Sequence, residues 1–191
     1  MSASMHNKVI TSNEVNIGKE IGRVLITESQ IKKGVRKLAD RLIADYEGRD
    51  LTIIGVLTGS LIFLSDLIRL LPFQIRLDTI CASLYVTSTI PNQGGVKILK
   101  EISLDIADKD VLVVDDIIDT GSTMVRIMES IKDYNPRSLK SCVLLNKRSR
   151  RQKESEPDYY CFEISPYFVV GYGLDYGNKY RNLPYIAVLK E

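Results

Sequence analysis

Hydrophobic residues recur with a helical period in one segment near the amino terminus. Residues at every third or fourth position are apolar there: Ile31, Val35, Leu38, Leu42 and Tyr46. This spacing places them on one face of a helix. Thr27 and Gln30 stand before the run at the spacing of a capping box, and Gly48 follows it as a stop signal. The pattern predicts an amphipathic helix between these signals.

A strand, a turn and a second helix are predicted next. Leu51–Val56 is a short apolar run rich in β-branched residues, and Thr58 and Gly59 suit a turn. Ser60–Leu71 is apolar and is followed by Pro72, so we predict a helix that ends there. The order strand, turn, helix is the basic unit of α/β folds.

The same unit recurs in the middle of the chain. We predict a strand at Val111–Val114, a loop at Asp115–Ser122 and a helix at Thr123–Tyr134, followed by a strand at Leu139–Leu145. Alternation of strands and helices is typical of an α/β protein with a mainly parallel sheet covered by helices. This is the predicted fold class.

Other segments carry weaker patterns. Ile75–Tyr85 is predicted as a longer strand. Val86–Gly95, which contains Pro91, is predicted as a mobile loop, and a lid is one interpretation of it. Two short strands are predicted near the carboxyl end, at Phe168–Tyr172 and Tyr185–Leu189.

Composition narrows the classes of partner. A chain of 191 residues suits a single domain, residues 1–191. The 26 Lys and Arg residues nearly balance the 24 Asp and Glu residues, which does not indicate binding to nucleic acid or to an anionic membrane. The longest uncharged stretch, Leu51–Ser65, is too short to cross a bilayer. We therefore expect a small-molecule partner.

Cysteine and histidine usage points to a reducing compartment and no zinc site. Cys81, Cys142 and Cys161 stand singly in apolar surroundings, without the spacing of a zinc site or a disulfide framework. They are interpreted as packed thiols of a cytoplasmic protein. Met1–Lys8 lacks the apolar core of a secretory signal, and His6 has no partner histidine with which to bind a metal.

Three carboxylates and a hydroxyl-rich helix start follow the strand Val111–Val114. Asp115 and Asp116 accept hydrogen bonds when ionised, so they suit the vicinal hydroxyls of a ribose or a bound magnesium ion. Asp119–Thr123 offers backbone N–H groups, hydroxyls and a glycine at a helix amino terminus, where phosphate is favoured. The alternative is a solvated Asp pair followed by ordinary helix capping. The Walker pattern of a nucleotide triphosphatase is absent.

Val113–Thr123 resembles the phosphoribosyl pyrophosphate signature of type I phosphoribosyltransferases. Leu144–Arg148 and Phe168–Tyr176, with Arg181 six residues after Asp175, resemble the hypoxanthine-guanine branch of that family in order and spacing. The resemblance implies the type I fold: a central, mainly parallel sheet flanked by helices, with a small hood formed by terminal segments. It also implies magnesium as the cofactor and a homodimer or homotetramer.

The resemblance implies a role for each matching residue. Asp115 and Asp116 would hold the ribose hydroxyls, and the 5′-phosphate would be bound by Asp119, Thr120, Gly121, Ser122 and Thr123. The Asp119 carboxylate would also take the proton from purine N7. The implied purine-binding residues are Lys147, Phe168, Val169 and Asp175. The implied pyrophosphate-binding residues are Thr58, Gly59 and Arg181, and the implied magnesium ligands are Asp115, Asp116 and Asp175.

Lys147 is the residue from which we predict the preferred base. Its ammonium has three donors and no acceptor, so it can bind the O6 of hypoxanthine or guanine but offers nothing favourable to the 6-amino group of adenine. The alternative, a solvated basic loop, suits its basic neighbours Arg148, Arg150, Arg151 and Lys153. Phe168 has an alternative too, because an aromatic residue that starts a strand is more often part of the core than a ligand contact.

Three positions depart from the family's pattern. Many relatives have Lys where Thr58 stands, which removes one positive contact from the pyrophosphate site. Leu84 and Tyr85 stand where relatives usually have a Ser-Tyr pair, so closure of a lid would differ in detail. Many relatives have Glu where Asp115 stands, a change that shortens the side chain but keeps its charge.

The sequence thus predicts an enzyme that converts phosphoribosyl pyrophosphate and hypoxanthine, and also guanine, to IMP or GMP and pyrophosphate in purine salvage. One rival is a regulatory protein that binds phosphoribosyl pyrophosphate or a nucleotide without turnover. The other keeps the reaction but uses adenine, xanthine or a pyrimidine as the base.

Overall fold

The computed structural model describes residues 20–86, 94–150 and 156–190. The predictions for Met1–Lys8 and His6 therefore lie outside the described residues, as does the middle of the loop predicted at Val86–Gly95.

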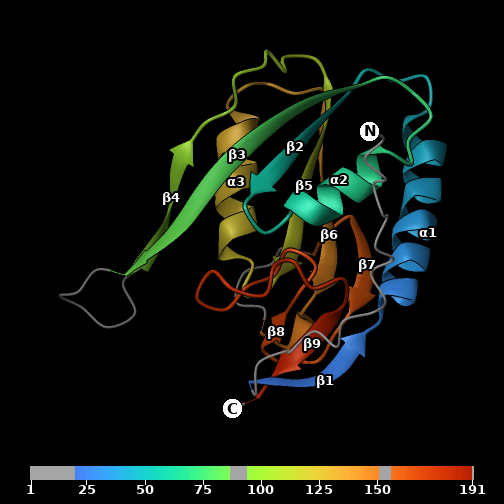
Figure 1. The fold of residues 1–191 in the computed structure, drawn as a ribbon. Helices are drawn as coiled ribbons and strands as arrows, with labels where there is room; N and C mark the ends of the chain where they lie inside the picture. Colours follow the sequence, from blue (N-terminus) through green and yellow to red (C-terminus); the bar gives the residue numbers. More distant parts are fainter. Residues whose placement is uncertain (1–19, 87–93, 151–155, 191) are drawn as a thin grey trace, which may run out of the picture.

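The main sheet is built from the strands that the sequence predicted and from two that it did not. Within the described residues its order is β4 (Gly94–Lys100), β3 (Ile75–Val86), β2 (Leu51–Leu57), β5 (Asp110–Ile118), β6 (Ser138–Asn146) and β7 (Tyr159–Glu163). Every neighbouring pair is parallel except β3 with β4, which is antiparallel. The prediction of a mainly parallel sheet is confirmed (Figure 1).

Helices cover both faces of this sheet. α1 (Glu28–Tyr46) and α2 (Leu61–Ile68) lie on one face and α3 (Ser122–Lys132) on the other (Figure 1). The capping box of α1 is present, since the Thr27 hydroxyl accepts from the Gln30 N–H and the Gln30 side chain accepts from the Thr27 N–H. The predicted start of the first helix is confirmed.

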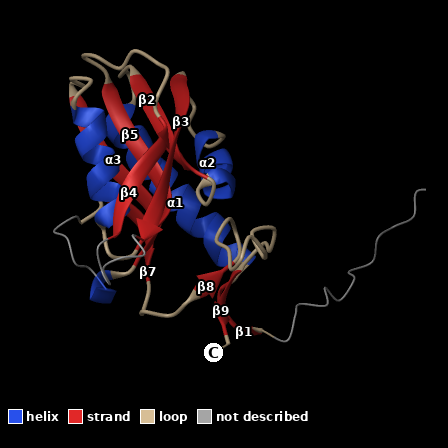
Figure 2. Ribbon diagram, turned by 90° about the vertical axis from the view of Figure 1, so that its left-hand side faces the viewer, coloured by secondary structure: helices blue, strands red, loops and turns tan. Residues whose placement is uncertain are grey.

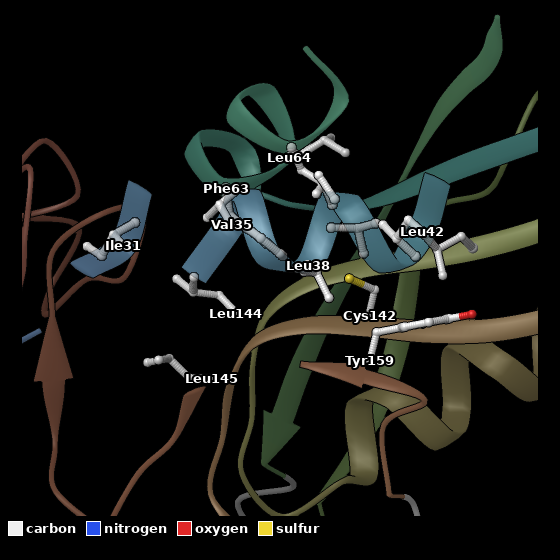
Figure 3. Packing of buried hydrophobic residues seen from close by; sticks show 14 of the residues in the cluster. Ile31, Val35, Leu38, Leu42, Phe63, Leu64, Cys142, Leu144, Leu145 and Tyr159 are labelled. Carbon is white, nitrogen blue, oxygen red and sulfur yellow. The ribbon is translucent and has the colours of Figure 1, made fainter. Parts of the chain in front are cut away.

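Side-chain alternation along the strands supplies a core on each face. Leu112 and Val114 of β5 pack toward α1 and α2, whereas Val111 and Val113 pack toward α3. Figure 3 shows the first of these cores, where a row of α1 side chains meets residues of α2, β6 and β7: Ile31, Val35, Leu38, Leu42, Phe63, Leu64, Cys142, Leu144, Leu145 and Tyr159. Strands buried on both faces explain the nearly continuous apolar runs in the sequence.

A second, smaller sheet forms the predicted hood. It joins β1 (Ile21–Ile26) from the amino-terminal part to β9 (Ile186–Leu189) and β8 (Val169–Val170) from the carboxyl-terminal part, with both pairings antiparallel. Figure 2 shows this sheet at one end of the main sheet. Terminal segments far apart in the sequence therefore make one unit, as predicted.

Four predicted boundaries were wrong. The helix predicted over Ser60–Leu71 ends at Ile68, because its last turn tightens into i→i+3 bonds such as Leu71 N–H to Ile68 O (3.3 Å). The loop predicted over Asp115–Ser122 begins only after Ile118, because β5 continues to pair with β6 as far as that residue.

The other two errors concern strands. Gly94 and Gly95 were predicted in a loop but pair with Val86 and Tyr85 as the start of β4. The two carboxyl-terminal strands are shorter than predicted, since only Val169–Val170 and Ile186–Leu189 pair. β1, β4, β7 and the short 3₁₀ helix at Arg148–Arg150 were not predicted.

The cysteines agree with the prediction of packed thiols. All three are free; Cys142 is buried, and Cys81 and Cys161 are partly buried. Burial raises the pKa of Cys161 to about 12 and raises the pKa of Cys142 as well, which keeps both protonated at neutral pH. None of the helices in the described part of the chain is long and apolar enough to span a bilayer.

Asp78 on β3 anchors the segment that follows β4. Its carboxylate accepts hydrogen bonds from the backbone N–H groups of Ser103 (2.5 Å), Leu104 (3.0 Å) and Thr79 (2.7 Å). Burial disfavours its charge, but these donors and the nearby Lys100 ammonium outweigh that effect and lower the pKa of Asp78 to about 2.

We expect Asp78→Asn to lower the free energy of unfolding by about 2 kcal/mol at pH 7, because a pKa shift of one unit corresponds to about 1.4 kcal/mol. The folded-state pKa lies below the ordinary value of 3.8, so this stabilisation is present above about pH 4 and is lost as the pH falls toward about 2. Urea unfolding between pH 7 and pH 3 measures it. Asp105→Asn is the control, because Asp105 is exposed and its carboxylate accepts, among the hydrogen bonds described, only from the nearby Ala107 N–H; its backbone O, which accepts from Arg76, is kept in the variant. Equal losses in both variants would contradict the expectation.

Candidate functional site

The carboxyl ends of β2 and β5 bring two polar segments together. The two strands pair in parallel, with Gly55 opposite Val114, so the residues that follow them emerge at the same edge of the sheet. The turn at residues 58–60 follows β2, and residues 119–121 follow β5. Ligands of open α/β sheets bind at this edge.

A cavity of about 450 Å³ opens at this edge of the sheet. Apolar side chains such as Val56, Ala82 and Met124 form part of its wall. The remaining wall includes nine of the predicted site residues: Gly59, Asp115, Asp116, Asp119, Thr120, Gly121, Thr123, Asp175 and Arg181. The structure therefore brings together the segments that the sequence predicted for ribose, phosphate and pyrophosphate.

Asp115 and Asp116 form a desolvated pair at the end of β5. Asp115 is 7% exposed, and its Oδ1 accepts from the Asp116 N–H at 2.9 Å. Burial, together with the Asp116 charge, raises the pKa of Asp115 well above its usual range, and burial also raises the pKa of Asp116. Hydroxyl donors or a cation bound in the cavity next to this pair would offset the free-energy cost of the two buried charges. Solvated surface carboxylates are therefore the wrong interpretation of this pair.

The carboxylates fit a magnesium ion that is shared with a substrate. Among the described residues, no group of three or more His, Cys, Asp or Glu side chains is arranged to hold a metal. Asp115, Asp116 and Asp175 thus do not make a cage of their own. Magnesium usually binds one or two carboxylates and completes its shell with substrate phosphate and water, and Asp115 and Asp116 match that pattern.

The loop before α3 presents backbone donors at a helix amino terminus. Gly121 is the cap residue, with φ of 87° in the left-handed region, and no side chain caps the first turn. In place of a capping hydrogen bond, the Ser122 N–H makes a long contact of 3.4 Å with the Thr120 hydroxyl. The alternative, ordinary capping of α3 by a side chain, is therefore wrong. The backbone N–H groups of the first turn of α3 make this end of the helix suitable for an anion.

Lys147 is buried beside Asp119. It is 4% exposed, its backbone N–H donates to Ile118 O at 3.0 Å, and its Nζ lies 3.4 Å from Asp119 Oδ2. The next residue, Arg148, is exposed and pairs with Glu156 and Glu163. Lys147 therefore differs from Arg148, as the resemblance implied; the side chain of Arg150, and Arg151 and Lys153, lie outside what the structure describes.

Two of the predicted site residues in the hood, Asp175 and Arg181, line the cavity, whereas Phe168 and Val169 are not among its lining residues. Asp175 and Arg181 form an ion pair at 2.7 Å, and Arg181 also donates to Gly173 O at 2.6 Å. Phe168 is 51% exposed and meets Tyr176 edge to face, with ring centroids 5.7 Å apart. The core interpretation of Phe168 is therefore wrong, whereas Val169 is buried in β8.

Gly59 lies where only a glycine fits. A Cβ on Gly59 would stand 2.0 Å from Asp116 Oδ2, and a Cβ on Gly173 would stand 2.1 Å from Gly59 O. The turn after β2 therefore packs closely against Asp116 on one side and the Gly173 backbone of the hood on the other. Thr58, at the position where many relatives have Lys, is exposed and follows a cis Leu57–Thr58 peptide bond.

A model of the phosphoribosyl transferase domain family matches residues 25–177. The chain belongs to this family. Its members are transferases, and the observed sheet order and hood are those of the type I phosphoribosyltransferase fold.

Relatives with names are similar to this chain over most of its length. The Listeria monocytogenes protein named bifunctional protein TilS/HprT is 39% identical over 185 residues, which cover 97% of this chain and 28% of the relative. The chain thus spans less than a third of that relative. A Bacillus subtilis protein named hypoxanthine-guanine phosphoribosyltransferase is 40% identical over 171 residues, which cover 90% of this chain and 94% of the relative. A Bacillus anthracis crystal structure of that name has a TM-score of 0.84 at 42% identity and covers 89% of this chain and 99% of that chain.

Two tyrosines that adjoin predicted site residues were given no role from the sequence. Tyr176 supports Phe168, and Tyr172 reaches from the hood to α2, where its hydroxyl donates to Asp66 Oδ2 at 2.7 Å. Both stand in the segment that resembles the hypoxanthine-guanine branch. Neither contact is encoded by a local pattern, because the partner of Tyr172 lies 106 residues away.

Proposed function

We propose that this chain transfers the 5-phosphoribosyl group from phosphoribosyl pyrophosphate to hypoxanthine or guanine, giving IMP or GMP and pyrophosphate. The observation that carries the proposal is the single cavity in which a desolvated carboxylate pair, an uncapped helix start and an arginine meet. The names of the relatives support the choice of base.

The phosphoribosyl group would lie along the end of β5. Asp115 and Asp116 accept hydrogen bonds from the two ribose hydroxyls, which replaces part of the solvation that burial removed. The segment Asp119–Thr123 binds the 5′-phosphate through its N–H groups and hydroxyls at the start of α3. These contacts fix the sugar carbon that is attacked.

The purine would enter between β6 and the hood. Lys147 donates to O6 of the base, Phe168 stacks on its face and the Val169 backbone meets its edge. Asp119 takes the proton from N7 while N9 attacks the sugar carbon. Lys147 Nζ lies 3.4 Å from Asp119 Oδ2, so one ion pair sets the positions of the group that binds O6 and of the group that accepts the N7 proton.

The pyrophosphate would leave toward the turn after β2 and the hood. Arg181 binds its oxygens through a planar fork of donors, and backbone groups of Thr58 and Gly59 add to this. Magnesium held by Asp115, Asp116 or Asp175 would neutralise part of the phosphate charge. Since Thr58 supplies no cation, Arg181 carries more of the protein's contribution on this side.

The decisive experiment is an assay of purified protein with magnesium, phosphoribosyl pyrophosphate and each of five bases: hypoxanthine, guanine, xanthine, adenine and uracil. We expect IMP and GMP to form, with little AMP. Binding of phosphoribosyl pyrophosphate without formation of any nucleotide would instead favour the regulatory protein. Turnover confined to xanthine, adenine or uracil would favour the rival in which the base differs.

We expect Lys147→Met to raise the KM for hypoxanthine about tenfold, because a hydrogen bond from a charged donor is lost while the length of the side chain is kept. The KM for phosphoribosyl pyrophosphate should change much less. Steady-state kinetics with each substrate varied measures both values. Arg148→Met is the control, since Arg148 is exposed and pairs only with Glu156 and Glu163 among the ion pairs described. Unchanged use of hypoxanthine by Lys147→Met would remove Lys147 from the purine site.

The single-domain organisation over residues 1–191, the homodimer or homotetramer and the cytoplasmic location stay predictions. Sedimentation of the purified protein measures its oligomeric state. A fully active monomer would contradict the prediction of a homodimer or homotetramer.

A further inference from the structure

A hydrogen bond between a hood tyrosine and α2 joins two elements that are distant in sequence and that adjoin the turn after β2. The Tyr172 hydroxyl donates to Asp66 Oδ2 at 2.7 Å, and Tyr172 is 6% exposed. The other carboxylate oxygen of Asp66 accepts from the Arg69 guanidinium, so both oxygens of this carboxylate have a partner. The donor of the Tyr172–Asp66 bond is therefore buried, and its acceptor is held by a second contact on α2.

The α2 end of this bond is a rigid reference point. Phe63, Leu64 and Leu67 of α2 are buried in the core. A Cβ on Gly55 of β2 would stand 2.4 Å from Leu64 Cδ2, so α2 packs directly against the backbone of the sheet. A side chain attached to α2 is thus held in place relative to the turn after β2.

The hood end of the bond lies in a strained turn. Tyr172 has φ of 51°, in the left-handed region that non-glycine residues rarely adopt, and it stands between Gly171 and Gly173, both with φ of 102°. Backbone bonds join Tyr172 N–H to Leu183 O (2.8 Å) and Gly173 N–H to Arg181 O (2.9 Å). Such a conformation persists where surrounding contacts impose it.

The same turn holds the groups that face the leaving pyrophosphate. Gly173 O accepts from the Arg181 guanidinium at 2.6 Å, and the Gly173 backbone presses against Gly59 O. Asp175 follows two residues later and pairs with Arg181. A movement of Tyr172 would therefore shift Arg181 relative to the turn after β2.

We propose that the Tyr172–Asp66 hydrogen bond positions Arg181 and Gly59 for the pyrophosphate group of the substrate. Neither Tyr172 nor Asp66 touches substrate in this account; both are positioning residues. The inference rests on the proposed phosphoribosyl transfer, because it assigns the Tyr172–Asp66 bond to the pyrophosphate half of the proposed site.

The purine half of the site has an independent support. Val169 of β8 pairs with Val188 of β9, and Leu189 N–H donates to Phe168 O at 2.9 Å. These contacts precede the strained turn and do not involve α2. Loss of the Tyr172–Asp66 bond should consequently weaken binding of phosphoribosyl pyrophosphate and pyrophosphate while it leaves the purine almost unaffected.

The test compares Tyr172→Phe with the wild-type protein in the forward reaction. We expect the KM for phosphoribosyl pyrophosphate to rise about five- to tenfold, in line with the loss of a hydrogen bond to a charged acceptor, and the KM for hypoxanthine to change less than about twofold. Calorimetry with phosphoribosyl pyrophosphate and magnesium should show the same loss of affinity. A wild-type protein that makes no IMP refutes the proposed function, whereas an active wild type with unchanged KM in the variant refutes only this inference.

Tyr159→Phe is the matched control. The Tyr159 hydroxyl also donates to an aspartate of a helix, Asp45 of α1, and Tyr159 is also buried, but it lies at the amino end of β7, away from the cavity. Both variants should lose thermal stability, and only Tyr172→Phe should change the KM for phosphoribosyl pyrophosphate. An equal rise of that KM in both variants would show a general effect of destabilisation and would overturn the proposal.

Variants of Asp66 test the bond from its other end. Asp66→Ala should reproduce the kinetic change of Tyr172→Phe, and the double variant should be no worse than either single one, because both remove the same bond. Asp66→Asn keeps an acceptor oxygen and should remain close to the wild type. Additive effects in the double variant would mean that the two residues act separately, which would overturn the proposal.

Discussion

Asp119→Asn is expected to lower kcat by about a hundredfold to ten-thousandfold, the range that general acid-base catalysis contributes. The amide keeps the size of the side chain and an acceptor oxygen that can still face Lys147, but it cannot take a proton from purine N7. Binding of phosphoribosyl pyrophosphate should change little, because the backbone donors of the loop before α3 remain. Single-turnover kinetics with hypoxanthine measures the chemical step, and calorimetry measures binding.

Asp133→Asn is the control for this substitution. Asp133 is exposed at the other end of α3 and is not among the residues that line the cavity. Its replacement changes the net charge by the same amount, so any effect of charge alone appears in both variants. A chemical step as fast in Asp119→Asn as in the control would remove Asp119 from the mechanism.

Gly59→Ala is expected to lower kcat/KM for phosphoribosyl pyrophosphate about a hundredfold, the loss that a displacement of about 1 Å in a site can cause. The new Cβ would stand 2.0 Å from Asp116 Oδ2, so the acidic pair or the turn after β2 must move. The neighbouring Gly173 backbone leaves the turn no space on its other side. Steady-state kinetics with phosphoribosyl pyrophosphate varied measures the effect.

Gly48→Ala separates this steric effect from the general cost of replacing a glycine. Gly48 follows α1, and within the described part of the chain no atom other than those of its chain neighbours lies within 4 Å of the position of its Cβ. Its φ of 77° makes alanine unfavourable there, so this variant should lose stability and keep its kcat/KM. Normal use of phosphoribosyl pyrophosphate by Gly59→Ala would mean that the turn is not part of the pyrophosphate site.

Local patterns predicted the parts of this protein that depend on neighbours in the sequence. The capping box at Thr27, the α1 stripe and the strand that precedes Asp115 were all found, because a period or a motif of a few residues specifies each of them. The strands of the hood were harder. β1 has a burial pattern without alternation and pairs with β9 more than 150 residues away, so no local signal marks it as a strand.

The sequence by itself determined the fold class and the order of chemical groups along the chain, because backbone periodicity and helix-start chemistry are local properties. Only the tertiary structure decided which of these groups are desolvated and which face one another. Burial raises the pKa of Asp115, Lys147 lies against Asp119, and Tyr172 reaches Asp66. Each of these depends on elements distant in the sequence packing together, since burial and contact are properties of the assembled fold and not of any single segment.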